Sequence, residues 1–191
     1  MKRICMLICF FLIKSNLIFS QTNQGLIEKS VWGVQVGFPG FWVHNESRIS
    51  EKFALRSEAG LDMGFWGSDF YDNTGFLLTP VITIEPRFYY NIYKRGEQRK
   101  WTKSNSANFI TLKTSYHPDW FVLSNQKDFS VLQDLSVIPT WGMRRSIGKS
   151  NFNYETGMGI GYRYIFAKSA GYLANESKVA ANLHLRIGYT F

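Results

Sequence analysis

Three histidines, His44, His117 and His184, are the side chains of this sequence best suited to proton transfer near neutral pH. Ser115 and Asp119 lie two residues to either side of His117. A serine, a histidine and an acid can together activate a hydroxyl nucleophile. Residues two apart on a strand point in parallel, however, and parallel side chains make a poor triad. We therefore predict that the protein is not an enzyme and that these histidines are hydrogen-bonded interior residues.

The sequence lacks the motifs that bind common cofactors and metals. Gly157, Gly159 and Gly161 do not have the spacing of a dinucleotide-binding loop, and they lie within an alternating strand pattern. There is no phosphate-binding loop, no paired-histidine zinc motif and no CxxC pair. We predict no cofactor and no metal.

Apolar residues alternate with other residues along most of the chain, which indicates β-strands because successive side chains of a strand point to opposite faces. Short turns such as Pro39-Gly40 separate the alternating segments, and turns of this kind join antiparallel neighbours. The sequence thus predicts an all-β fold, an eight-stranded antiparallel up-and-down β-barrel. The expected strands are 31–38, 41–49, 53–65, 76–91, 108–123, 131–147, 152–166 and 178–191.

The polar faces of these strands carry charges of both signs, whereas no charge falls on the apolar faces of 53–65, 76–91 and 152–166. Seven acidic residues oppose seven basic ones on the polar faces. The acidic residues are Glu46, Glu58, Asp62, Glu85, Asp119, Asp134 and Glu155, and the basic ones are Arg48, Arg56, Arg87, Lys113, Arg144, Arg163 and Arg186.

An eight-stranded barrel has an interior just wide enough to be filled by its own side chains. Charges that are kept from bulk water there must be paired. We therefore predict an ion-pair network in the lumen, and we favour a polar core that fixes the barrel's register over a gate or a proton-sensitive pore. Its expected members are Arg56, Glu58, Glu85, Arg87, Arg144, Glu155 and Arg186.

The last segment alternates for thirteen residues, 179–191, and ends on an aromatic residue. Its apolar face includes Leu183, Leu185, Ile187, Tyr189 and Phe191. This pattern resembles the closing strand of Gram-negative outer-membrane β-barrels, where the assembly machinery reads it. The whole chain after residue 20 is similar to small barrels of the OmpX or OmpA-membrane-domain type. The resemblance implies a transmembrane, porin-like barrel in outer-membrane lipid, with both termini in the periplasm and the barrel-assembly machinery as a partner.

The first twenty residues have the features of a secretory signal. Lys2 and Arg3 precede an apolar run over 4–13, which is too short to span a bilayer as a helix. We predict a cleaved signal peptide over 1–20 and hence export.

Removal of the signal would change the composition of the mature protein. Both cysteines, Cys5 and Cys9, would leave with it, and 19 basic residues would remain against 14 acidic ones, a net charge of about +5. This mild excess does not indicate nucleic acid as a partner. We expect a flexible N-terminal lead-in over 21–30 and a single barrel domain over 31–191, acting as a monomer.

The expected outer loops are 39–40, 66–75, 124–130 and 167–177. Trp66, Phe70 and Tyr71 are the candidate contacts for an unidentified surface ligand. On the opposite side, the basic run 93–108 is either a segment that binds an acidic partner or lipid head groups, or a mobile solvated turn.

These features predict a non-enzymatic outer-membrane barrel with a structural or surface-interaction role. A narrow channel or small-ligand transport barrel is the alternative, and a lipid A-modifying enzyme comes third. The segment 41–49 is anomalous, since Asn45 and Ser47 fall on its outward face. It requires either a bulge or a position outside the bilayer.

Overall fold

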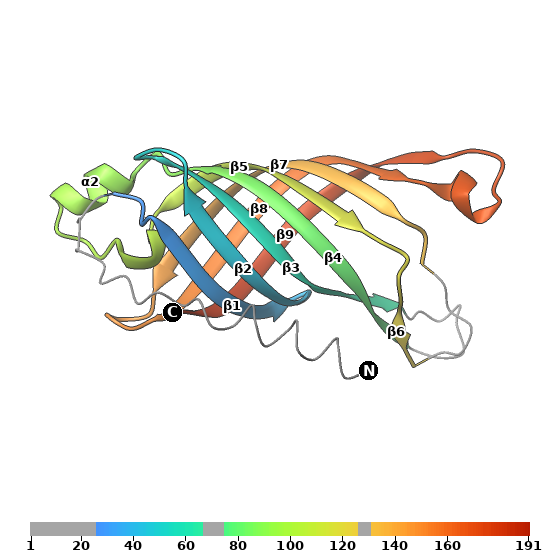
Figure 1. The fold of residues 1–191 in the computed structure, drawn as a ribbon, viewed down its shortest axis with the longest axis horizontal. Coiled ribbons are helices and arrows are strands. Elements are labelled where there is room, and N and C mark those ends of the chain that lie inside the picture. The colour runs from blue at the N-terminus through green and yellow to red at the C-terminus, as the bar shows by residue number, and fades with distance from the viewer. Residues whose placement is uncertain (1–25, 67–74, 126–130) are drawn as a thin grey trace, which may run out of the picture.

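The computed structural model describes residues 26–66, 75–125 and 131–191. The signal peptide predicted over 1–20 lies outside the described residues, as does the lead-in as far as residue 25. Eight long antiparallel strands form a closed up-and-down barrel (Figure 1), so the predicted fold is confirmed. Each long strand pairs with the long strands next to it in sequence, and β9 pairs with β1 to close the sheet.

The long strands are β1 (Ser30–Phe38), β2 (Gly40–Arg48), β3 (Phe53–Trp66), β4 (Gly75–Phe88), β5 (Asn108–His117), β7 (Asp134–Ser146), β8 (Phe152–Ile165) and β9 (Glu176–Thr190). A two-residue strand, β6 (Leu123–Ser124), extends the sheet beside β4. One end of the barrel carries α2 (Ile92–Glu97), η1 (Lys103–Asn105) and the C-terminus, and we call it the capped end. The other, the loop end, carries β6 and η2 (Ala167–Ala170).

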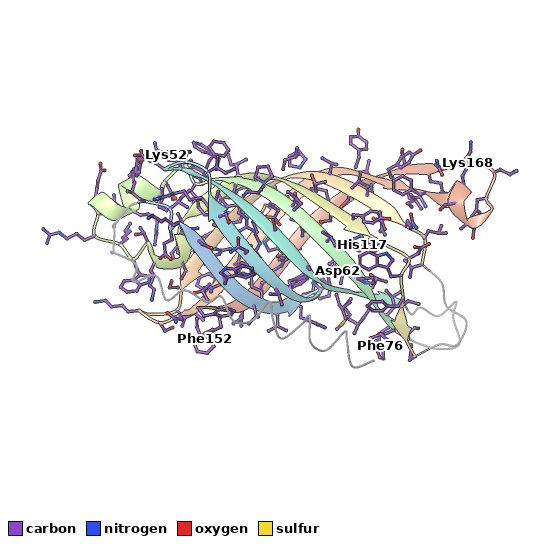
Figure 2. The ribbon with its side chains drawn as sticks, in the orientation of Figure 1. Lys52, Asp62, Phe76, His117, Phe152 and Lys168 are labelled. Carbon is purple, nitrogen blue, oxygen red and sulfur yellow. The ribbon has the colours of Figure 1, made fainter. Side chains whose placement is uncertain are left out.

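The barrel is polar inside and apolar outside. Arg56, Arg87 and Arg144 face the lumen and are completely buried. On the outer wall, Ile160 and Leu183 are 72% and 70% exposed, and Phe152 projects away from the sheet (Figure 2). This arrangement follows from strict alternation, because each strand places one set of side chains inward and the other outward.

A small apolar cluster closes the capped end. It consists of Ile27, Ala54, Tyr89, Ile92, Ala107 and Phe109. Ile27 is 1% exposed, and its carbonyl accepts a hydrogen bond from the Arg48 guanidinium at 3.1 Å. The prediction of a flexible lead-in over 21–30 therefore does not hold for its last residues, since the apolar side chain of Ile27 is packed against the barrel.

The second strand contains no bulge. The pairing of β1 with β2 runs without interruption from Ser30 opposite Ser47 to Gly37 opposite Gly40. Asn45 does face outward, near the capped end, where its amide donates to the Ser30 hydroxyl at 2.9 Å and its carbonyl accepts from Ser47 at 2.7 Å. These polar side chains thus satisfy one another on the outer surface.

The fifth strand is shorter than predicted. It ends at His117, and Pro118, which has no backbone N–H to donate to a sheet, follows directly. Asp119 is consequently exposed beyond the strand, where it accepts a hydrogen bond from Gln133 at 2.7 Å. Its predicted place on the inward face is therefore wrong. Within the described ranges, no helix is long and apolar enough to cross a membrane.

Candidate functional site

The lumen near the capped end is filled by ion pairs centred on Glu155 of β8. Its carboxylate accepts two parallel hydrogen bonds from Arg87 of β4, at 2.8 and 3.0 Å, and a third from Arg144 of β7 at 2.8 Å. Arg87 also donates to Glu85 at 2.7 Å. A planar guanidinium matches a carboxylate in this two-pronged way, which fixes the direction of both side chains.

Glu46 of β2 completes this cluster. Its carboxylate lies 3.1 Å from Arg144 and 3.7 Å from Arg87, and it accepts a hydrogen bond from the Tyr89 hydroxyl at 2.6 Å. Asn105 donates to the same carboxylate at 2.5 Å. Glu46 was among the expected lumen charges but not among the expected network members. Glu46 lies two residues from His44 and so shares the inward face of β2, and this position is the sequence signal that predicts a place for it in the network.

A second cluster lies around Glu58 of β3. Arg56 and Arg186 both contact its Oε2 atom, at 2.5 and 2.8 Å. The Gln35 side-chain carbonyl accepts from the same two arginines, at 2.7 and 3.4 Å. The Arg186 guanidinium also stacks 3.7 Å above the ring of Trp42, so its charge is met by an aromatic face as well.

The two clusters together contain four arginines and four glutamates that are at most 3% exposed. The structure brings all seven predicted network residues into ion pairs and adds Glu46. Charges buried in this way cost desolvation, which only pairing and hydrogen bonds offset. The arrangement can hold strands that are distant in sequence in one register, and it fills the lumen with side chains.

Part of the basic run 93–108 folds back onto the capped end. We call this part, residues 98–107, the plug. Ser104, Asn105 and Ser106 are buried. The Ser104 carbonyl accepts from Arg144 at 3.2 Å, and its hydroxyl pairs with Thr190 at 2.8 Å. The prediction of a mobile solvated turn is therefore wrong for this part of the run.

Glu28 of the lead-in fastens this plug. Its carboxylate accepts from the Ser104 backbone N–H at 2.8 Å, and its own N–H donates to the Asn105 side-chain carbonyl at 2.9 Å. Burial raises the pKa of Glu28 above its ordinary value, although the hydrogen bond from Ser104 and the nearby Lys103 act in the opposite direction.

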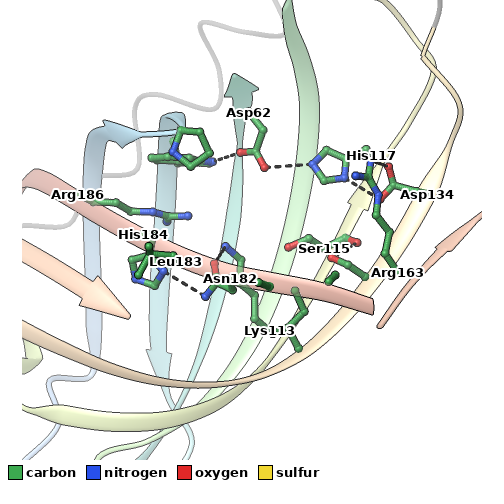
Figure 3. A pocket seen from close by; sticks show the side chains of 16 residues that line it. Asp62, Lys113, Ser115, His117, Asp134, Arg163, Asn182, Leu183, His184 and Arg186 are labelled. Atoms are coloured by element: carbon green, nitrogen blue, oxygen red, sulfur yellow. Dashed lines mark hydrogen bonds and ion pairs between the residues drawn. The ribbon is translucent and has the colours of Figure 1, made fainter. Parts of the chain in front are cut away.

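Towards the loop end, the lumen widens into a cavity of about 180 Å³ (Figure 3). His117 lies across it between two carboxylates, Asp62 and Asp134, each 3.1 Å from one ring nitrogen. Arg163 also pairs with Asp134. The Ser115 hydroxyl is bonded to Thr83 at 2.8 Å. With its nitrogens directed at carboxylates, His117 makes no hydrogen bond to Ser115.

The other two histidines differ from each other. His184 lies 3.2 Å from the Asn182 amide and 3.6 Å from Glu155. His44 is 1% exposed, and neither of its ring nitrogens has a hydrogen-bond partner in the part of the chain that the structure describes. The prediction that all three are hydrogen-bonded is therefore wrong for His44.

The C-terminal pattern lies on the outer wall. Its five residues are between 39% and 71% exposed, in alternation with buried lumen residues of β9. Trp66 is the last residue of β3, whereas Phe70 and Tyr71 lie outside the described residues. Among residues 26–66, 75–125 and 131–191 there is no group of three or more His, Cys, Asp or Glu side chains placed to hold a metal ion.

Comparisons with models of known protein families, with curated proteins and with solved structures found no match to this chain.

Proposed function

We propose that the protein is a non-enzymatic integral outer-membrane β-barrel of the OmpX or OmpA-membrane-domain type, with a structural or surface-interaction role. The observation that carries this proposal is the inverted distribution of its side chains. Four arginines and four glutamates are buried in the lumen, while the exposed outer wall is formed by residues such as Ile160, Val179 and Leu183. An apolar surface that encircles a protein is stable only where something other than water covers it.

Aromatic side chains support a bilayer as that cover. Near the capped end, Trp32, Phe152 and Phe191 are exposed on the wall, and near the loop end Trp120 and Tyr162 are exposed. Membrane barrels carry such aromatic girdles at both interfaces. The long strands have 9 to 15 residues, and about 9 to 11 tilted residues cross the hydrocarbon layer.

The filled lumen favours a role that requires neither the passage of ions or solutes through the barrel nor catalysis. Its ion pairs and the plug occupy the passage from the capped end, and the Ser115 hydroxyl is bonded to Thr83 instead of His117. We therefore assign the function to the outer wall and the loops. Joint replacement of Trp66, Phe70 and Tyr71 tests the surface role, which predicts loss of a binding phenotype with retention of the barrel.

The first test is the gel mobility of the protein from isolated outer membranes, boiled and unboiled in SDS. A closed barrel has no free strand edge, so it resists the detergent until heated. We expect outer-membrane fractionation and a mobility shift on boiling. A protein that fractionates with the soluble periplasmic contents and shows no shift would contradict the proposal.

A further inference from the structure

The barrel wall is incomplete beside the β1–β2 hairpin. The pairing of β9 with β1 begins only at Leu185, opposite Phe38, and the pairing of β3 with β2 ends at Asp62, opposite Gly40. Beyond these points β9 continues to Glu176 paired with β8 alone, as far as the described chain shows. The β1–β2 hairpin therefore ends before β3 and β9 do (Figure 1), and we call the stretch above Pro39, where these two strands have no described backbone partner on this side, the notch.

The cavity near the loop end reaches this notch. Its lining includes Pro39 at the tip of the hairpin. It also includes both faces of β9, the inward Asn182 and His184 and the outward Leu183. Backbone atoms of outward-facing residues also line the inside of a wall, so it is Pro39, together with residues 180–184 of β9 that have no β1 partner, that places the cavity at the notch.

One cation in this cavity makes no direct ion pair with a carboxylate of the described residues. Arg163 is paired with Asp134, and Arg186 with Glu58. Lys113 makes no ion pair with any described residue, and its Nζ atom lies 3.5 Å from the Asn182 carbonyl oxygen. Since Asn182 lies on the part of β9 that pairs with β8 but not with β1, this contact places the ammonium group beside the notch. Glu58, Glu85 and Asp62 act on this ammonium from beyond direct ion-pair contact, so its N–H groups can still donate to the oxygen of a bound carboxylate.

An apolar groove of about 360 Å³ lies on the outer wall below the notch. Val34, Val36, Phe41, Val43, Ile187 and Tyr189 line it. Val36 and Phe41 are each within three residues of Pro39, so the groove leads towards the hairpin tip. A molecule with an anionic head and one hydrocarbon chain would match both features, with the head at Lys113 and the chain in the groove.

We propose that the notch is a lateral binding site for a fatty acid, whose carboxylate enters the cavity beside Lys113 and Asn182 while its chain lies on the outer wall. The ion-pair clusters fill the lumen beneath this site, so the ligand does not enter from the capped end. The site is tested in neutral detergent, and its existence does not depend on the membrane in which the protein resides.

The probe is dodecanoate, which is added to the protein in maltoside micelles. Binding is followed by NMR of the indole N–H groups of isotope-labelled tryptophan. The Trp42 indole N–H donates to Asp62 at 2.7 Å and lines both the cavity and the groove. The Trp141 indole donates to Tyr90 at 2.9 Å, and Trp141 lines neither. We expect a saturable shift of Trp42 without a shift of Trp141.

Lys113→Met should weaken dodecanoate binding about tenfold or more, the usual effect of losing one charge-assisted hydrogen bond. Lys178→Met is the control, because Lys178 is a lysine of β9 whose side chain is 62% exposed and paired with Glu176. If Lys113→Met fails to give the boiling-dependent mobility shift of a folded barrel, Asn182→Ala is used in its place.

Dodecanol, which has the hydrocarbon chain without the carboxylate, separates the contribution of the head group to binding from that of the chain. Weaker binding of dodecanol than of dodecanoate, with no further loss in the Lys113 variant, is the supporting result. Equal binding of the two probes, or dodecanoate binding that Lys113→Met leaves unchanged, would mean that the groove merely takes up hydrocarbon, and the proposal would be overturned.

Discussion

Glu155 is the residue on which the lumen's electrostatic balance depends most. It joins Arg87, Arg144 and His184, which come from three different strands, and it is completely buried. Its removal would leave Arg87 and Arg144 without the acceptor that they share, in a site where both guanidinium groups are completely buried. The two oxygen atoms of one side chain therefore control the stability of a large part of the barrel.

We predict that Glu155→Gln lowers the free energy of unfolding by about 3 to 5 kcal/mol, the range for breaking a buried pair. The measurement is urea unfolding of the protein in micelles. Glu176→Gln is the control, because the Glu176–Lys178 pair is exposed at the loop end and such pairs contribute about 1 kcal/mol or less. Equal losses for the two variants would contradict a structural role for the network.

Glu28 makes the fastening of the plug sensitive to pH. Its pKa in the folded protein is raised by burial, so the folded state binds the proton more tightly than the unfolded state. This contribution to stability is present below the unfolded pKa of Glu28 and is lost as the pH rises through the folded pKa. Deprotonation therefore weakens the plug.

We predict that Glu28→Gln removes this pH dependence while it retains an oxygen to accept from the Ser104 N–H. Hydrogen exchange of the Ser104 amide, corrected for the intrinsic rate, should speed up from pH 4 to pH 7 in the unaltered protein and stay constant in the variant. The same pH dependence in both proteins would exclude Glu28 as the titrating group.

Alternation predicted the direction of side chains but not their partners. The inward positions of Arg56, Glu85 and Glu155 follow from parity along one strand, which is a local property of the chain. That Arg87 meets Glu155 depends on how the barrel closes, since these residues are 68 positions apart. The unpartnered state of His44 also depends on this long-range packing and has no local signal.

At the level of elements, the plug shows how an irregular segment gains a fixed position. Ser104 and Asn105 have φ of 54° and 55°, left-handed values that ordinary residues adopt rarely but Asn tolerates. Their backbone and side chains then bond to Arg144, Glu46 and Glu28. A periodic pattern cannot reveal such contacts, which is why the sequence indicated only a basic run here.

We predict that Asn105→Ala loosens the plug without opening the barrel. The variant loses the acceptor of the Glu28 N–H and a donor to Glu46, and each such bond contributes about 1 kcal/mol. Exchange of the Glu28 amide should speed up about fivefold or more, while amides of β8 keep their protection. Faster exchange in β8 as well would show that the plug and the barrel unfold together.

The lengths of the paired regions, like the contacts of the plug, depend on long-range pairing that local alternation does not reveal. Alternation predicted each long strand, but it could not show that β9 extends beyond its β1 partner, because an unpaired strand alternates as regularly as a paired one. The notch, and with it the exposed edge beside Lys113, arises from the unequal lengths of neighbouring strands. It becomes visible only when the register of the whole sheet is known.

For the whole molecule, the ion pairs and the plug act in series along the barrel axis. Arg87 and Glu155 span the lumen, and Asn105 lies behind them at the capped end. An ion would have to displace these paired charges to pass, and it would lose its own hydration in doing so. The protein as it stands should therefore be closed.

We predict no steady conductance for the unaltered protein in a planar bilayer. The triple variant Arg87→Ala, Glu155→Ala and Asn105→Ala removes one charge of each sign together with a plug contact, so it opens space without changing the net charge. Three buried arginines and three buried glutamates remain in the lumen, so we expect a small conductance without strong charge selectivity. The control Lys178→Met, at the loop end, should show no steady conductance. Steady conductance in the unaltered protein would show that the network is not a seal and would favour a channel, because ions would then be passing between the paired charges without displacing them.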